Sequence, residues 1–161
     1  MIRPTALVLS LALAAPLAAE DVGDMAPRDG WVVRDVALSF DDAVAAVRAA
    51  APEAGLAVVT QAGPTGAAAR RGIAIPGNRV IGLFNNDVAV RLLRLSTPAM
   101  IEAPLRVYVT EDGDGTATVS HVVPSVRLAP YRDSSADPAA FDALAAELDS
   151  AFAVVMAGID G

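Results

Sequence analysis

The chain has 161 residues, a formal net charge of −7, no Cys and no Lys, and 54% of its residues are hydrophobic. An acidic surface repels phosphate groups, so nucleic-acid binding is disfavoured. The lack of Cys excludes disulfides, thiol redox chemistry and thiolate metal sites.

The first 19 residues have the layout of a secretory signal peptide. Arg3 precedes an apolar run from Ala6 to Ala15, which is followed by the small residues Ala18-Ala19. This run is too short to cross a bilayer as a helix, which disfavours a retained anchor. We therefore expect cleavage after Ala19 and a periplasmic protein of 142 residues. Loss of Arg3 with the leader would change the net charge from −7 to −8, and no second apolar segment predicts membrane association.

Residues 20–30 are polar and form a lead-in to the single domain, 31–161. Residues 31–39 alternate with their apolar phase on the even positions, as in a strand with one buried face. Ser39 is a typical N-cap for a helix over about 40–50, which Pro52 and Gly55 should end. A second strand is predicted at 56–60.

Residues 63–72 predict a solvated loop, in which the Arg70-Arg71 pair is the most basic local spot. An anion contact is the alternative role for this pair. The apolar run 79–84 predicts a strand covered on both faces. Asn85-Asn86-Asp87 then supplies the cap of a helix that ends near residues 96–98.

Residues 105–110 and 116–123 alternate as two strands, and the Asp-Gly-rich turn 112–115 between them predicts a hairpin. Leu105, Val107 and Val109 share one face of the first strand, opposite Arg106 and Tyr108. In the second strand, the only histidine, His121, shares a face with Val119 and Val123. We expect His121 at the margin of the core.

Residues 124–137 read as a connector, and Asp137-Pro138 begins the longest amphipathic helix, 138–159. This helix should cover one face of the sheet. The predicted fold is therefore α+β: a curved antiparallel sheet of about five strands, backed by helices, in the order β-α-β-β-α-β-β-α.

The sequence resembles the bacterial domain-of-unknown-function family numbered 302 in four features. These are the segment VIGLFNND at 80–87, Pro104, the hairpin YVTEDGDG at 108–115, and Val119-Ser120 followed by Pro124. The resemblance covers most of residues 31–160. It implies a curved antiparallel sheet backed by helices, often paired as dimers, with no activity established for the family as a whole.

The sequence departs from the family's pattern at the strand-helix junction. Many relatives have Asn-Pro there, often with a Cys just before it and another Cys after the proline that opens the next strand. Here Asn86 matches the Asn, Asp87 replaces the proline, and Leu105 follows Pro104. Any thiol role of those relatives is therefore lost.

No residue pattern identifies a catalytic or metal site. A lone His makes a poor transition-metal site, and Glu111, Asp112 and Asp114 lack the ordered ligand spacing of a calcium loop, so a solvated turn is the better interpretation. The candidate ligand-binding residues are Asn86, His121, Tyr108 and Arg106. Capping for Asn86 and a hydrogen-bonded position at a sheet edge for His121 are the simpler roles.

Two functional hypotheses remain open. The preferred one is a non-enzymatic periplasmic module that binds a small molecule or a protein partner between sheet and helices, without a cofactor and with a homodimer as one possible assembly. The alternative is a periplasmic enzyme that uses His121 with a nearby carboxylate, or Asn86 as an oxyanion donor. A cavity without convergent titratable groups would favour binding, whereas a hydrogen bond from His121 to an acid would favour catalysis.

Overall fold

The structure is a computed structural model that describes residues 23–160, so the expected leader and cleavage site lie outside the described residues. It shows one α+β domain, as predicted. The strands are β1 (Trp31–Val36), β2 (Ala57–Ala62), β3 (Asn78–Phe84), β4 (Leu105–Glu111) and β5 (Ala117–Val122). The helices are α1 (Phe40–Glu53), α2 (Thr65–Ala69), α3 (Asn86–Leu95), α4 (Pro124–Leu128) and α5 (Pro138–Ala157), with 3-10 turns η1 (Pro98–Glu102), η2 (Ala129–Tyr131) and η3 (Gly158–Asp160).

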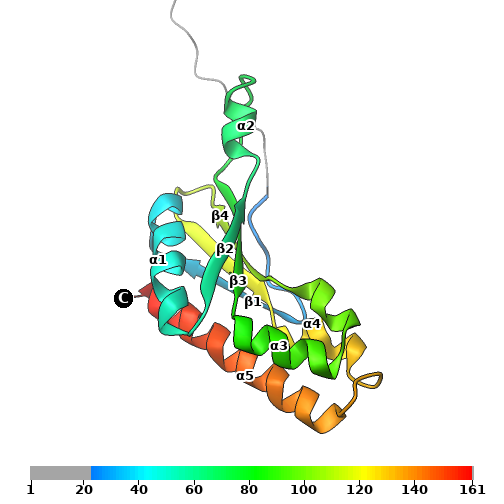
Figure 1. Cartoon of the computed structure of the whole chain (residues 1–161). Helices are drawn as coiled ribbons and strands as arrows, with labels where there is room; N and C mark the ends of the chain where they lie inside the picture. Colours follow the sequence, from blue (N-terminus) through cyan, green and yellow to red (C-terminus); the bar gives the residue numbers. More distant parts are fainter. Residues whose placement is uncertain (1–22, 161) are drawn as a thin grey trace, which may run out of the picture.

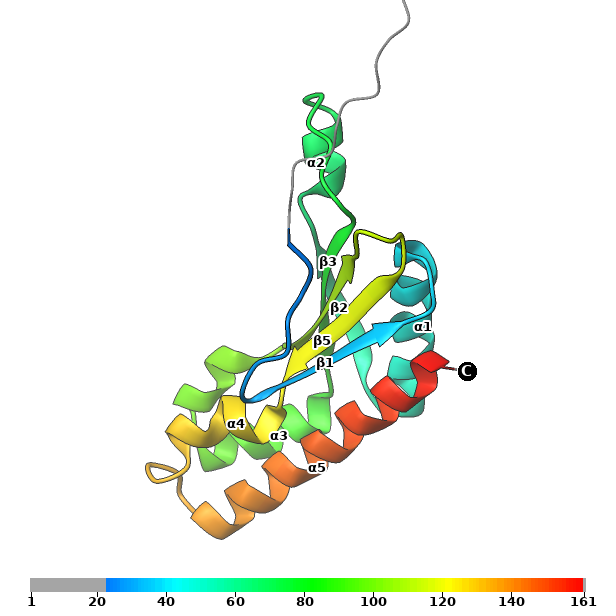
Figure 2. The same cartoon turned by 180° about the vertical axis from the view of Figure 1, so that it is seen from behind.

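The five strands form one open antiparallel sheet in the order β1-β5-β4-β3-β2. The predicted hairpin places β4 beside β5, with Val107 opposite His121, and β1 pairs with the other edge of β5. The long helices α1 and α5 lie on the same face of the sheet, which Figures 1 and 2 show from opposite sides. The lead-in lies on the other face, where Met25 lines a hollow with Tyr108.

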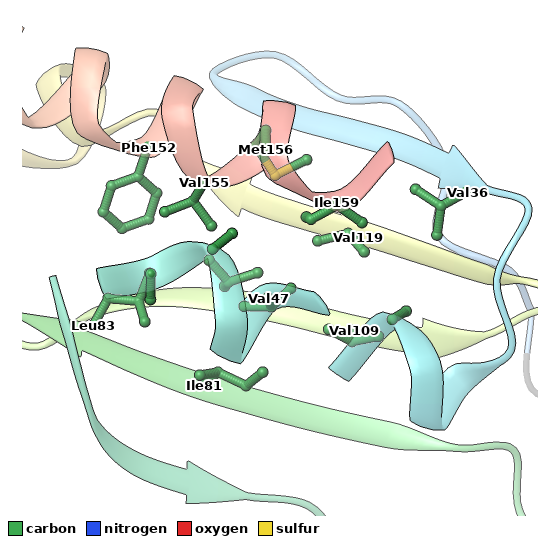
Figure 3. Packing of buried hydrophobic residues seen from close by; sticks show 14 of the residues in the cluster. Val36, Val47, Ile81, Leu83, Val109, Val119, Phe152, Val155, Met156 and Ile159 are labelled. Carbon is green, nitrogen blue, oxygen red and sulfur yellow. The ribbon is translucent and has the colours of Figure 1, made fainter. Parts of the chain in front are cut away.

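The main core lies between the sheet and these two helices (Figure 3). It confirms the predicted strand phases, because Val107, Val109 and Val119 are fully buried under the helices. Helix α1 contributes Val47, and the second half of α5 contributes Phe152 and Val155. Burial of these apolar side chains is the main term that stabilises the fold.

A second apolar cluster lies around the first half of α5. Phe141, Leu144 and Leu148 pack there with Leu92 of α3 and Leu128 of α4. Helix α5 therefore joins both clusters. Every residue of its predicted inward stripe is buried, including Ile159 in the turn η3.

Several boundaries differ from the predicted ones. Helix α1 continues through Pro52 to Glu53, because a proline this close to the end removes little of the helical hydrogen bonding. The chain then leaves the helix at Gly55, which has φ 69° and whose N–H donates to the Pro52 carbonyl at 2.9 Å. Strand β1 ends at Val36 rather than at residue 39.

Two segments predicted to be irregular contain helix. The expected loop 63–72 includes α2, and the expected connector 124–137 begins with α4 and η2. Pro124 is the first residue of α4, a position where its fixed φ and missing N–H are tolerated. The Asp149 carboxylate of α5 accepts a hydrogen bond from the Ser125 N–H at 2.8 Å, so a contact from a distant element stabilises this short helix.

Candidate functional site

The structure does not bring the four predicted site residues together. Asn86 is exposed at the start of α3, and His121 is buried on the helix-covered face of β5. Arg106 and Tyr108 lie on the opposite face of the sheet, as the alternation predicted. A single site that uses all four residues is therefore inconsistent with this fold.

Asn86 does not cap α3, which corrects the role expected for it. The N-cap is Asn85, whose side-chain Oδ1 accepts from the Val88 N–H at 3.0 Å and whose Nδ2 donates to the Gly55 carbonyl at 2.8 Å. Asn86 is the first residue inside the helix. Its side chain is thus placed by local helix geometry at the surface.

Tyr108 and Arg106 border different hollows on the sheet face opposite to the long helices. The Tyr108 hydroxyl accepts a hydrogen bond from Asn78 Nδ2, and both residues line a hollow beside the lead-in. Arg106 borders a smaller hollow with Glu102 and Arg127. The Glu102 carboxylate thus lies between two arginines, and it forms an ion pair with Arg127.

The most suitable binding site is a groove of about 410 Å³ at the β1 edge of the sheet, which we call the His121 groove. Its walls come from β1, the end of β5, the start of α4 and the second half of α5. Its lining is mainly apolar: Val32, Val123, Pro124, Ala153, Met156 and Ala157, with Arg34, His121 and Asp149 as the charged or titratable members.

His121 is only 4% exposed, and its ring is tilted against an aromatic ring of the core. Its ring centroid lies 4.9 Å from that of Phe152, with 57° between the ring planes. Nδ1 lies 3.0 Å from the Val122 carbonyl oxygen. Because a carbonyl can only accept, this contact places the proton on Nδ1 and leaves Nε2 as an acceptor.

Burial lowers the pKa of His121, because an imidazolium would be poorly solvated there. The Val122 carbonyl and the negative charge of Asp149 oppose this shift without reversing it. His121 is therefore neutral at pH 7. Its Nδ1 hydrogen bond goes to a backbone carbonyl rather than to an acid, which is not the arrangement expected of a general base held by a carboxylate.

Arg34 and Asp149 also have structural partners. Arg34 Nη2 donates to the backbone carbonyl of Met156, which ties β1 to the last turns of α5. Asp149 holds the start of α4 through the Ser125 N–H. The groove thus has an apolar interior with three polar groups fixed at its border, a pattern typical of small-molecule sites.

Sequence reasoning found His121 but missed its two polar neighbours. Arg34 had a usable signal, because it lies in phase with Val32 and Val36 on the face predicted to be buried. No sequence signal marked Asp149, since an acidic residue beside Leu148 is expected at the polar border of any amphipathic helix. Only the packing of α5 against β1 and β5 brings Asp149 near His121.

The described residues contain no group of three or more His, Asp or Glu side chains that could hold a metal ion. The acidic turn at 112–115 also has a structural contact. The two carboxylate oxygens of Asp112 accept from the single hydroxyl of Thr118, Oγ1, at 2.8 and 3.0 Å. Between residues 23 and 160, no helix is both long and apolar enough to span a bilayer.

Comparisons with known proteins agree with this architecture. The crystal structure of an uncharacterized conserved DUF302 protein from Bacillus stearothermophilus superposes with a TM-score of 0.69 at 17% sequence identity, covering 81% of this chain and 98% of that one. No protein of curated function matches the chain. The sequence profile of the domain of unknown function DUF302 matches residues 32–155, which is most of the chain. The protein therefore belongs to the DUF302 family.

Proposed function

We propose that the protein is an exported, non-enzymatic module that binds a small, largely apolar molecule in the His121 groove. The observation that carries this proposal is the groove itself, with about 410 Å³ of space and a mainly apolar lining. Such a volume is in the range of small-molecule sites, in which apolar surface supplies affinity and a few polar groups supply orientation.

The polar groups of the groove suggest how a ligand would be oriented. Neutral His121 offers Nε2 as an acceptor, while Arg34 and Asp149 present opposite charges at the border. A ligand with an apolar body and one hydroxyl or amide group would fit this arrangement. A charged ligand would need a negative group near Arg34 and a positive group near Asp149.

The binding test fills the groove without disturbing the core. Ala153 lines the groove and is exposed, so Ala153→Trp should occupy the space that a ligand needs. Ala146→Trp, at an exposed position elsewhere on α5, is the matched control. Fluorescence titration with the apolar probe 1-anilinonaphthalene-8-sulfonate should show saturable 1:1 binding that is lost in Ala153→Trp and kept in Ala146→Trp. Equal binding by all three proteins would contradict the proposal.

Native mass spectrometry of the protein purified from its own host should show a co-purifying small molecule that Ala153→Trp lacks.

The enzymatic alternative has a different signature. Suppose that a metabolite screen detects turnover in the wild type. If His121→Gln keeps the melting temperature but lowers this turnover rate by roughly 10²-fold, His121 acts as a general acid or base. That outcome would replace the binding proposal.

The periplasmic location has its own test. The apolar run that ends at Ala18-Ala19 motivates it. N-terminal sequencing of the protein from a periplasmic extract should begin at or near Glu20. Recovery of a chain that retains Met1, in the cytoplasm alone, would contradict export and leave the binding proposal to be judged by the groove variants.

A further inference from the structure

A polar hollow of about 360 Å³, which we call the Arg79 hollow, shares no lining residue with the His121 groove. Its lining comes from the start of α1, the segment 63–77, β3, the end of β4 and the turn before β5. Figure 1 shows the start of α1 and the turn between β4 and β5 at the same end of the sheet. Arg79 lies opposite Val109, on the helix-covered face of the sheet. The hollow therefore continues that face beyond the apolar core.

Arg79 is the one basic residue that lines the hollow, and it has no partner among residues 23–160. The residue is half-buried, and its Nε is covered by protein without a hydrogen bond. Its two Nη groups keep accessible surface and form no hydrogen bond or ion pair within the same residues. Guanidinium groups that lose contact with water normally gain a hydrogen-bond acceptor, because an unpaired donor costs free energy. Arg79 is thus open to a ligand that accepts hydrogen bonds.

Two carboxylates line the Arg79 hollow, and they differ in what they already bind. Glu111 Oε2 accepts from the Gly77 N–H at 2.6 Å, so this carboxylate holds the end of β4 to the start of β3. Asp41, in the first turn of α1, is exposed and accepts no hydrogen bond from another residue of the described chain. Neither carboxylate forms an ion pair with Arg79. The hollow therefore presents one unpaired cation, Arg79, and one unpaired anion, Asp41.

Two separate charges of opposite sign suit a ligand that carries both. A carboxylate matches the planar N–H fork of Arg79, and an ammonium group matches Asp41. A phosphate or a simple carboxylic acid would gain from Arg79 but would face two carboxylates of like charge, and a simple amine would leave Arg79 unpaired. The half-buried ring of Phe40 also lines the hollow and offers an apolar surface to the body of the ligand.

We propose that the Arg79 hollow binds a free amino acid with an aliphatic side chain. The carboxylate of the amino acid binds Arg79, its ammonium group lies at Asp41 and its side chain packs against Phe40. A hollow of about 360 Å³ is in the range of small-molecule sites. Because this site shares no residue with the His121 groove, each of the two binding proposals stands or fails by its own test.

Three molecules of similar shape separate the two charges. L-Leucine carries both, 4-methylpentanoate lacks the ammonium group, and 3-methylbutylamine lacks the carboxylate. Isothermal titration calorimetry on the protein expressed from its full-length gene should give a dissociation constant below about 1 mM for L-leucine. The other two molecules should each bind at least about tenfold more weakly, because each leaves one charged group of the hollow without its hydrogen-bond partner.

Arg79→Met distinguishes a binding role from a structural one, because Met keeps much of the aliphatic stem and removes the guanidinium group. The variant should weaken L-leucine binding at least about tenfold. It should melt no lower than the wild type, because the lost group has no partner in the empty protein. A structural role would instead lower the melting temperature. Arg48→Met, at an exposed position of α1, makes the same change in net charge and should alter neither property.

Asp41→Asn tests the other end of the ligand. Asp87→Asn is the matched control, because Asp87 is also exposed in the first turn of a helix, α3, so both changes remove one carboxylate from a helix start. Asp41→Asn should weaken binding of L-leucine and leave binding of 4-methylpentanoate unchanged or tighter. Asp87→Asn should leave the affinity for both molecules as it is in the wild type.

Three results would overturn the proposal. The first is a wild type that binds none of L-alanine, L-valine and L-leucine at concentrations up to about 10 mM. The second is 4-methylpentanoate binding as tightly as L-leucine, which would make the hollow a site for anions alone. The third is L-leucine binding that Arg79→Met keeps and Ala153→Trp abolishes, which would assign the amino acid to the His121 groove. Circular dichroism of each variant verifies that it is folded.

Discussion

The two neighbouring asparagines at the start of α3 illustrate how one residue position decides a structural role. Asn85 caps the helix and also bonds Gly55, whereas Asn86 is exposed. We therefore expect Asn85→Ala to lower the free energy of unfolding by about 0.5–2 kcal/mol, the usual cost of losing a cap. Asn86→Ala is the matched control and should change it by less than about 0.5 kcal/mol. Urea unfolding measures both. A larger loss from Asn86→Ala would show that Asn86, rather than Asn85, carries the cap.

His121 should make stability depend on pH in a defined direction. Its folded-state pKa is lowered, mainly by burial, so the unfolded chain binds a proton more readily than the native one. The stability contribution of neutral His121 is therefore fully present above about pH 6.5, its unfolded pKa, and is lost as the pH falls from there toward the folded pKa. The charged groups near the ring are Arg34 of β1 and Asp149 of α5.

His121→Gln removes this titration and keeps a hydrogen-bonding side chain. The wild type should lose stability relative to the variant as the pH falls below 6.5, with a slope of up to about 1.4 kcal/mol per pH unit. Urea unfolding at several pH values between 5 and 8 measures the difference. Parallel pH profiles for the two proteins would mean that His121 titrates alike in the folded and unfolded chain.

Among the elements, α5 contributes to both apolar clusters, so its inward side chains should dominate stability. Phe152 is 1% exposed, whereas Val154 on the same helix is 47% exposed. Phe152→Ala should cost about 3–5 kcal/mol, the usual range for a large side chain removed from a packed core. Val154→Ala should cost less than about 0.5 kcal/mol. Thermal or urea unfolding of the pair tests this, and similar losses in both would mean that the helix is packed differently.

At the scale of the whole molecule, residues 63–77 project from the body as an arm with α2 in its outer part (Figure 1), and this arm should be energetically separable from the body. The one buried apolar residue of α2, Ala68, belongs to neither apolar cluster. Replacing residues 64–76 with Asn-Gly would leave a loop of six residues, namely 63, the two new residues and 77–79, between the paired Ala62 and Val80. We expect this variant to unfold cooperatively with a melting temperature within a few degrees of the wild type, as seen by calorimetry. Loss of cooperative unfolding would show that the arm supports the body.

Much of the fold could be predicted from the sequence because its signals are local. Alternation in 105–110 and 116–123, the Asp-Gly turn between them and the Asp137-Pro138 helix start each depend on neighbouring residues. The structure confirms these elements and their order. The helices α2 and α4 were missed, because short helices have weak periodicity and α4 is held by Asp149, 24 residues away in the chain from Ser125.

The sequence by itself determined the strand phases, the long helices, the face of His121 and the family resemblance, because each depends on a pattern within a short window. The tertiary structure alone decided which candidate residues share a site. The His121 groove exists because β1 pairs with β5 and α5 packs across them, so Arg34, His121 and Asp149 meet from three distant segments. Such long-range pairing is set by global packing, and no local pattern encodes it.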